Sequence, residues 1–295
     1  GGDVRFSVAS NPEFLREGAA IQDFMRPDRV VIGTDDDAPL AIMQDLYRPL
    51  YLNETPFVLT NIATAELIKY AGNAFLATKI SFINEIANLC EKIGADVQAV
   101  ARGIGLDGRI GPKFLHAGPG FGGSCFPKDT RSAAYFAREA GESLEIVEAV
   151  IRVNERQRQR MVEKIQAAVG GDLSGKTIAV LGLSFKPETD DMRDAPSVDI
   201  IRGLIELGAS VRAFDPVAMA PAAKLLPEVT LAKDPYQACQ GADAMVIITE
   251  WNQFRMLDLE RIRGLMQRSL VVDLRNVYKP DQMQRAGFEY VSVGR

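Results

Sequence analysis

One stretch of the chain combines a thiol, a cation and a carboxylate with a glycine-rich turn. It covers residues 118–129, reads GPGFGGSCFPKD, and places Cys125 beside Lys128 and Asp129. A cysteine acts as a nucleophile only as thiolate, and a nearby cation or helix N-terminus favours that form. Pro127 and the residues after it are typical of a helix start, which puts Cys125 near the positive end of a helix dipole. The stretch predicts nucleophilic chemistry; the alternative is a surface turn with an incidental cysteine.

The same stretch also matches G-x-G-x-x-G at Gly118, Gly120 and Gly123. A dinucleotide fingerprint follows a buried strand and opens a helix. Residues 112–117 read PKFLHA and lack the pattern of a hydrophobic strand. We therefore interpret the turn as a substrate and nucleophile loop.

Bulk composition narrows the class of protein. The chain has 295 residues, enough for more than one domain, and a net charge of −5, which argues against nucleic acid as the main partner. No apolar run is long enough for a membrane span, and no signal peptide is visible. Three separated cysteines are typical of reduced thiols in a cytoplasm, and a single histidine argues against a zinc site or a Ser-His-Asp triad. We expect no metal.

Three segments differ in their pattern. Residues 1–60 alternate short strands with a helix over 39–50 and are predicted to end a Rossmann-like α/β domain; the strands are expected at 6–10, 29–33 and 57–60. Residues 61–169 are predicted to form a central helical domain that carries the cysteine loop. Residues 170–295 open with a glycine-rich turn and then alternate strands and helices, with strands expected at 176–182, 210–216, 244–249 and 270–273. That alternation predicts a doubly wound parallel sheet, which binds ligands beyond the carboxyl ends of its strands.

A long amphipathic helix is predicted over 61–94. This segment has no proline, and its apolar residues recur at three- and four-residue steps, among them Ile68, Phe75, Ile83, Ile86 and Cys90. Shorter helices are expected at 130–140 and 143–169. We expect the long helix to mediate a homodimer; packing within one chain is the alternative.

Four motifs in this order resemble one family. They are NPEFLREG at 11–18, LIKYAGN at 67–73, GRIGPKFL at 108–115 leading into the cysteine loop, and FKPETDDMR at 185–193. Their order and spacing resemble the UDP-glucose 6-dehydrogenase branch of the nucleotide-sugar dehydrogenases over essentially the whole chain. Members begin with a complete NAD-binding domain that carries G-x-G-x-x-G, and no such motif precedes Asn11. The resemblance therefore implies a chain that lacks most of that domain and binds NAD poorly.

The resemblance implies the reaction and its residues. UDP-glucose would be oxidised at C6 to UDP-glucuronate with two NAD, through a thiohemiacetal and a thioester on Cys125. Lys69 and Asn73, four residues apart on one helix face, would bind the developing oxyanion and a water. Asp129 would orient Lys69 or activate water, and Glu13 would be the general base for thioester hydrolysis.

Binding residues are implied in the same way. For the sugar nucleotide they are Phe14, Leu15, Arg109, Phe114, Phe121, Gly122, Gly123, Phe185, Lys186 and Arg275, with Arg109 supplied across a subunit interface. For NAD they are Glu17, Lys128 and Arg193. Three alternatives stay open: a dehydrogenase of GDP-mannose or UDP-N-acetylmannosamine, a non-catalytic UDP-sugar-binding module, and a thiol-dependent redox or acyl-transfer protein.

Overall fold

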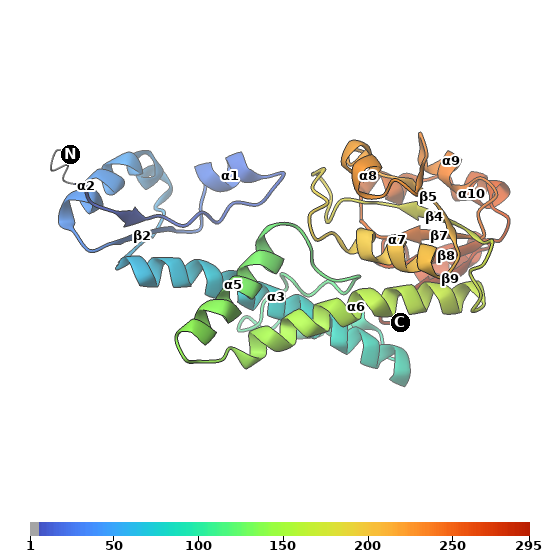
Figure 1. Cartoon of the computed structure of the whole chain (residues 1–295), viewed down its shortest axis with the longest axis horizontal. Coiled ribbons are helices and arrows are strands. Elements are labelled where there is room, and N and C mark those ends of the chain that lie inside the picture. Colours follow the sequence, from blue (N-terminus) through green and yellow to red (C-terminus); the bar gives the residue numbers. More distant parts are fainter. Residues whose placement is uncertain (1–5) are drawn as a thin grey trace. The chain divides into compact units, whose positions relative to one another are not determined.

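The computed structural model describes residues 6–295, and the chain divides into two compact units between Phe75 and Leu76 (Figure 1). This division falls inside the long helix, so the three predicted segments remain a prediction. Among the described residues, no helix is both long and apolar enough to cross a membrane.

The N-terminal unit holds a three-stranded sheet in the order β1-β2-β3. Its elements are β1 (Ala9–Ser10), α1 (Ala20–Met25), β2 (Val30–Thr34), α2 (Asp37–Leu46) and β3 (Phe57–Thr60). Strands β2 and β3 are parallel, and β1 pairs antiparallel to β2. Val30, Ile32 and Leu50 form a small core with apolar residues of α2. The parallel pair with a helix between its strands is the α/β pattern that the sequence predicts.

Three predicted elements of this unit have different bounds. The strand expected over 29–33 covers Val30–Thr34, a shift of one residue. The strand expected over residues 6–10 is reduced to Ala9–Ser10, and the helix expected over 39–50 begins at Asp37 and ends at Leu46. Pro49 has no N–H to donate within an α-helix, and the chain continues instead as a 3-10 helix (Arg48–Asn53).

The long helix α3 (Ile62–Ile93) has nearly the predicted bounds. Asn61 caps its start, because Oδ1 accepts a hydrogen bond of 2.8 Å from the N–H of Thr64. Gly94 ends it with a φ of 72°, a left-handed conformation that glycine adopts without steric cost. The helix buries Ala77, Ile83, Ala87 and Cys90.

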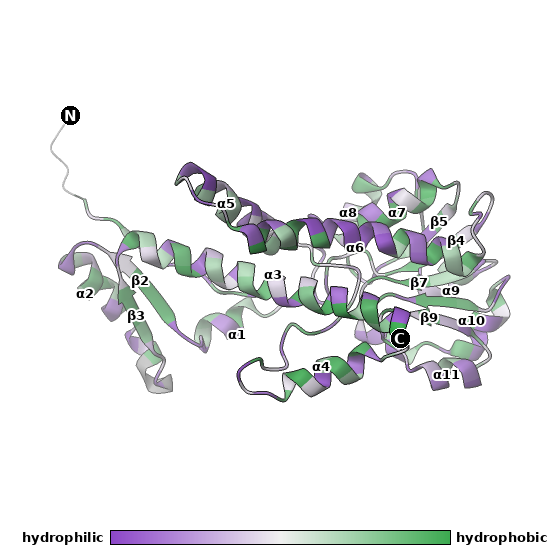
Figure 2. Cartoon of the chain, turned by 90° about the horizontal axis from the view of Figure 1, so that it is seen from below, coloured by the Kyte–Doolittle hydropathy of each residue, from purple (hydrophilic) through white to green (hydrophobic). Residues whose placement is uncertain are grey.

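The other helices of the central region are α4 (Val97–Gly105), α5 (Cys125–Glu139) and α6 (Glu145–Val169). The C-terminal half of α3 runs beside α6 (Figure 2), joined by hydrogen bonds such as Asn88 to Gln157 and by the ion pair between Lys164 and Glu91. Between α4 and α5 the chain is irregular, and this segment contains the glycine-rich stretch. No helix was predicted at α4.

The C-terminal domain is a six-stranded sheet in the order β6-β5-β4-β7-β8-β9, and every neighbouring pair is parallel. The strands are β4 (Thr177–Leu181), β5 (Ser210–Phe214), β6 (Thr230–Leu231), β7 (Ala244–Ile247), β8 (Leu270–Asp273) and β9 (Glu289–Ser292). The helices are α7 (Pro196–Glu206), α8 (Met219–Leu225), α9 (Pro235–Cys239), α10 (Leu259–Leu265) and α11 (Pro280–Arg285), with a 3-10 helix at Asn252–Met256.

Both faces of this sheet are covered. Along β4, Ile178 and Val180 belong to one buried cluster and Ala179 and Leu181 to another. The first cluster includes residues of α6 and α7, and the second includes residues of α9 and α10. The strand order reverses between β4 and β7, so this doubly wound sheet places its ligand crevice at the carboxyl ends of those two strands.

Candidate active site

The predicted nucleophile stands where irregular backbone becomes a helix. Residues 118–124, the glycine loop, are irregular, and α5 begins at Cys125 rather than at Thr130 as predicted. The thiol is partly exposed and its Sγ lies 3.8 Å from Ser124 Oγ. The first-turn N–H groups of a helix carry partial positive charge, so Cys125 lies at the positive end of the α5 dipole.

Side chains of α3 and α6 form hydrogen bonds with the backbone of the glycine loop. Asn84 Oδ1 accepts a hydrogen bond from the N–H of Gly118 at 2.8 Å, and Gln157 Nε2 donates to the carbonyl of Gly118 at 2.8 Å. Asn154 pairs with Phe121 twice, accepting from its N–H at 2.8 Å and donating to its carbonyl at 3.0 Å. All three amide side chains belong to buried residues. They satisfy backbone groups that would otherwise be buried without partners.

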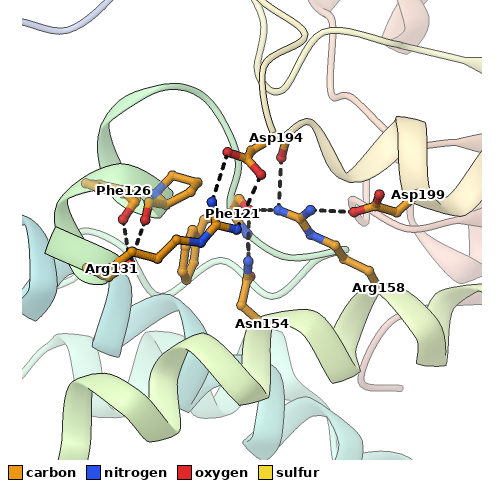
Figure 3. A network of polar contacts seen from close by, with 9 residues as sticks. Phe121, Phe126, Arg131, Asn154, Arg158, Asp194 and Asp199 are labelled. Carbon is orange, nitrogen blue, oxygen red and sulfur yellow. Dashed lines mark hydrogen bonds and ion pairs between the residues drawn. The ribbon is translucent and has the colours of Figure 1, made fainter. Parts of the chain in front are cut away.

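Arg158 connects the glycine loop to the C-terminal domain (Figure 3). Its Nη2 donates to the carbonyls of Phe121 at 2.8 Å and Asp194 at 2.9 Å, and its Nη1 donates to the Asp199 carboxylate at 2.5 Å. Arg131, on α5, pairs with the Asp194 carboxylate at 3.5 Å. The loop therefore has partners on α6 and on the segment that leads into α7.

Three aromatic rings pack together at the glycine loop, one before it, one within it and one after it. The ring of Phe126 lies 6.0 Å, between centroids, from the rings of both Phe114 and Phe121, in edge-on contacts. Phe114 has a φ of 64°, which is uncommon for a bulky residue. The packing fixes the segment before the loop against the first turn of α5.

The C-terminal domain brings further predicted residues to the loop. A Cβ added to Gly123 would lie 2.8 Å from carbons of the Phe185 ring, so only glycine lets the backbone pack this closely on it. The Nζ of Lys186 lies 5.4 Å from the centroid of that ring. Of the predicted binding residues in the glycine loop, the structure therefore brings Gly123 directly against Phe185.

Arg275 lies at the same edge of the sheet. Its Nε donates to the Ile248 carbonyl at 2.8 Å and lies 3.1 Å from Glu250 Oε2, and its Nη2 donates to the Phe185 carbonyl at 3.3 Å. A Cβ on Gly118 would lie 3.2 Å from its Nη1. The guanidinium therefore stands between the glycine loop and the carboxyl end of β7.

A buried carboxylate supports this arginine. Burial raises the pKa of Asp273, at the end of β8, although its carboxylate accepts hydrogen bonds from the N–H of Arg275 at 3.0 Å, the N–H of Tyr278 at 3.0 Å and the hydroxyl of Tyr290 at 2.8 Å. These bonds fix the turn on which Arg275 stands.

Within the N-terminal unit, Glu13 and Lys69 come together. The Nζ of Lys69 lies 3.2 Å from Glu13 Oε1 and also donates to the Glu13 carbonyl, while the N–H of Leu15 donates to Glu13 Oε2 at 2.6 Å. The Arg29 guanidinium lies 3.6 Å from the ring centroid of Phe14. Two predicted catalytic side chains, Glu13 and Lys69, are thus hydrogen-bonded to each other.

The remaining predicted residues lie in different surroundings. Asn73 follows Lys69 by one turn on α3, and Glu17 is half-buried in the same unit. Lys128 pairs with the buried Asp129 at 2.5 Å. Arg193 pairs with Asp191 at 2.9 Å, and its carbonyl accepts from the N–H of Gly123.

Arg109 lies on an exposed turn. It pairs with Asp107 at 2.6 Å, and this guanidinium lowers the pKa of the Asp107 carboxyl. Its hydrogen bonds among the described residues are made to Asp107, not to the glycine loop.

Known protein families match three successive segments of the chain. Sequence models of the UDP-glucose/GDP-mannose dehydrogenase family match the NAD binding domain at residues 1–51, the central domain at 63–156 and the UDP binding domain at 179–280. A UDP-glucose 6-dehydrogenase of Rhizobium meliloti (strain 1021) is 57% identical over 98% of this chain and 67% of its own length. The chain belongs to the UDP-glucose/GDP-mannose dehydrogenase family.

Two further members of this family are similar to the chain over nearly its whole length. UDP-glucose 6-dehydrogenase TuaD of Bacillus subtilis (strain 168) is 50% identical over 100% of this chain and 63% of its own length. The structure of a UDP-glucose dehydrogenase from the archaeon Pyrobaculum islandicum is 42% identical, with a TM-score of 0.88 over 95% of this chain and 63% of that one. The chain spans about two thirds of the length of the curated relatives it matches. The predicted α/β fold, with a central helical region and a C-terminal parallel sheet, is confirmed.

The comparison also qualifies one expectation. The NAD binding domain of the family is represented at residues 1–51, so the prediction that the chain lacks most of this domain is only partly borne out. The predicted dehydrogenase family with NAD as its cofactor is confirmed.

The amide and guanidinium side chains under the glycine loop escaped sequence reasoning. Gln157 and Arg158 follow Asn154 by three and four residues on α6, on the face that also buries Val150 and Met161. Polar residues at core positions of an amphipathic helix are the signal that was available, since a buried polar side chain needs a partner. The identity of that partner depends on the fold.

Proposed function

We propose that this member of the family acts in the NAD-dependent oxidation of UDP-glucose to UDP-glucuronate. The observation that carries the proposal is the place of Cys125, directly after a loop that packs against Phe185 and Arg275 at the ligand crevice of the C-terminal sheet. A thiol beside a nucleotide-sugar site explains how one enzyme oxidises an alcohol twice. The names of the relatives support UDP-glucose as the sugar nucleotide.

In the proposed mechanism, Cys125 retains the aldehyde. After the first oxidation its thiolate adds to the C6 carbonyl: a C–S bond forms, the C–O π bond breaks, and the oxygen takes up a proton to give a thiohemiacetal. Loss of a second hydride and a proton leaves a thioester, and attack of water breaks the C–S bond to release the carboxylate and the thiol. NAD, when bound, accepts one hydride in each oxidation.

Lys69 and Asn73 are proposed to stabilise the oxyanion at C6. A cation and an amide donor one turn apart suit a negatively charged oxygen. Glu13, which is hydrogen-bonded to Lys69, is the proposed base that deprotonates the attacking water, and Asp129 orients Lys69 or that water. We further propose that Lys69, Asn73 and Glu13 act at the same reacting carbon as Cys125.

Substrate binding is assigned to two groups of residues. Lys186 and Arg275 would neutralise the diphosphate, with Phe121, Gly122, Gly123 and Phe185 around the rest of the nucleotide. Phe14, Leu15 and Phe114 would line the sugar, and the exposed Arg109 would reach the site of a second subunit. Its exposure supports a role in trans, because its pairing with Asp107 is a surface ion pair of low energy.

NAD is proposed to contact Glu17, Lys128 and Arg193. The side chains of Lys128 and Arg193 are 65% and 66% exposed, so both cations are accessible to a pyrophosphate. Residues 1–60 contain no G-x-G-x-x-G turn, so no phosphate-binding turn is assigned within them.

The assembly is proposed to be a homodimer through α3. Phe75, Phe82 and Leu89 recur at seven-residue steps and are each about half exposed or more, at 65%, 49% and 53%. Such a stripe of large apolar side chains suits a helix partner. Sedimentation equilibrium that gives only the monomer mass would contradict the dimer. The three free cysteines support a reducing compartment, such as the cytoplasm.

Titration calorimetry with UDP-glucose tests the proposal. We expect the chain to bind UDP-glucose in preference to GDP-mannose, and Lys186→Ala and Arg275→Ala each to weaken binding about tenfold or more, since each loses a charged contact to phosphate. Lys224→Ala, which removes an exposed lysine of α8, is the matched control and should bind as the parent does. Arg275→Lys separates loss of the guanidinium from loss of charge. Equal binding by all variants would overturn the assignment of this crevice.

A further inference from the structure

The carbonyl of Phe121 receives two donors, and they come from one helix. Asn154 Nδ2 and Arg158 Nη2 both bond to it, at 3.0 Å and 2.8 Å. A carbonyl oxygen has two lone pairs, so this acceptor is saturated. The backbone of the glycine loop, four residues before Cys125 in sequence, is therefore held by α6 at its centre.

Arg158 also bonds to the C-terminal domain, at Asp194 and Asp199. The same Nη2 bonds the carbonyl of Asp194, and Nη1 bonds the carboxylate of Asp199 on α7 (Figure 3). The side chain is only 11% exposed. One planar guanidinium thus joins three acceptors from the glycine loop and the C-terminal domain, a geometry that an ammonium group cannot reproduce.

The glycine loop and the segment before α7, which Arg158 joins, are closely packed against each other. A Cβ on Gly122 would lie 2.4 Å from the Asp194 carbonyl and 2.9 Å from Pro196 Cδ, and the N–H of Gly123 donates to the Arg193 carbonyl at 2.9 Å. Asp194 has a φ of 47°, in the left-handed region. A backbone in this region is retained when surrounding contacts fix it.

We propose that Arg158 is a positioning residue, which docks the glycine loop on the C-terminal domain and thereby places Cys125 relative to the bound nucleotide sugar. The proposal rests on the proposed function for the role of Cys125. The docking itself rests on the contacts of Arg158 and of the glycine loop, and not on the proposed function. Arg158 acts through the backbone of Phe121 and Asp194.

Alkylation of the three cysteines by iodoacetamide, followed by peptide mass mapping, tests the docking in the whole chain. Arg158→Lys keeps the charge and can reach one acceptor at a time. We expect it to raise the alkylation rate of Cys125 about tenfold, because a loop that has lost charged hydrogen bonds opens more often. Cys90 and Cys239, which are 2% and 0% exposed, should stay as slow as in the parent.

Arg138→Lys is the matched control. Arg138 pairs with Glu148 at 2.9 Å between α5 and α6, so the variant alters an arginine ion pair that also involves α6 but that does not include the glycine loop. Its Cys125 rate should equal that of the parent. A general loss of stability in Arg158→Lys would instead accelerate all three cysteines and lower the melting temperature, and that result would overturn the proposal.

A UDP-glucose titration separates the inference from the proposed function. If the parent binds UDP-glucose and Arg158→Lys binds it about tenfold more weakly with an unchanged melting temperature, the positioning role is supported. If the parent binds and the variant binds equally well, the positioning role is wrong while the proposed function stands. Failure of the parent to bind contradicts the proposed function, and the alkylation rates still decide the docking.

Discussion

The glycine loop and the six-stranded sheet both bury their backbone, and they satisfy its hydrogen bonds in different ways. In the sheet, β4 pairs with the backbones of β5 and β7 on its two sides. In the glycine loop, the groups of Gly118 and Phe121 pair with side chains of α3 and α6. The sheet therefore shares its stability among many similar contacts, whereas the loop depends on a few specific ones.

Gly122→Ala is expected to have the largest effect, and it tests whether the glycine loop depends on a few specific contacts. The added methyl would lie 2.4 Å from the Asp194 carbonyl, which is backbone and cannot rotate away. We expect a loss of about 3–4 kcal/mol in the free energy of unfolding, by chemical denaturation, together with loss of UDP-glucose binding.

Gly264→Ala is the matched control in the sheet domain. Gly264 lies in α10, and among the described residues no heavy atom outside its own helix and neighbours comes within 4 Å of an added Cβ. Alanine is the better helix former, so this variant should gain up to about 1 kcal/mol. Equal effects of the two substitutions would show that the glycine loop is no more tightly packed than an exposed helix.

The regular parts of the fold were predictable because their signals are local. The strand at Phe57–Thr60 was predicted with its observed bounds, and α3 lies within one residue of the predicted range at each end. Apolar periodicity, Asn61 at the start and Gly94 at the end define that helix without tertiary information. Strand β6 is only two residues long, and so short a segment carries no pattern that could have predicted it.

The candidate site was predictable in part. The residue types of the cysteine loop pointed to Cys125, and the strand ends pointed to Lys186 and Arg275. Asn84, Asn154 and Arg158 were missed, because their partners are more than thirty residues away in sequence. Pairing over such separations is decided by the packing of α3, α6 and α7.

A second contrast concerns two thiols, Cys239 in the sheet domain and Cys125 directly after the glycine loop. Burial behind the sheet raises the pKa of Cys239 from 9.0 to about 12, whereas Cys125 is partly exposed. The folded chain therefore keeps the Cys239 proton above pH 9, where the unfolded chain has released it. The stability from this group is fully present below about pH 9 and is lost as the pH rises toward 12.

Cys239→Ala should remove the contribution of this thiol to the alkaline sensitivity. Between pH 9 and pH 10.5 we expect the parent to lose about 2 kcal/mol more of its unfolding free energy than the variant does. Urea denaturation at several pH values measures the difference between the two slopes, and a constant offset from the lost sulfur does not affect it. Parallel pH profiles for the two proteins would show that the buried thiol titrates as an exposed one does.

The smallest effect is expected from Ile178→Val in the sheet. Ile178 is fully buried on β4, and its backbone pairs with Val211 and Ala244 whichever side chain it carries. Loss of one methylene should cost about 1 kcal/mol in urea denaturation and leave the alkylation rate of Cys125 unchanged, because the ladder keeps the strand in place. The rate is the decisive measurement. If this change accelerates Cys125 as much as Arg158→Lys does, the loop is held by the stability of the whole domain, and the contrast between side-chain and backbone pairing fails.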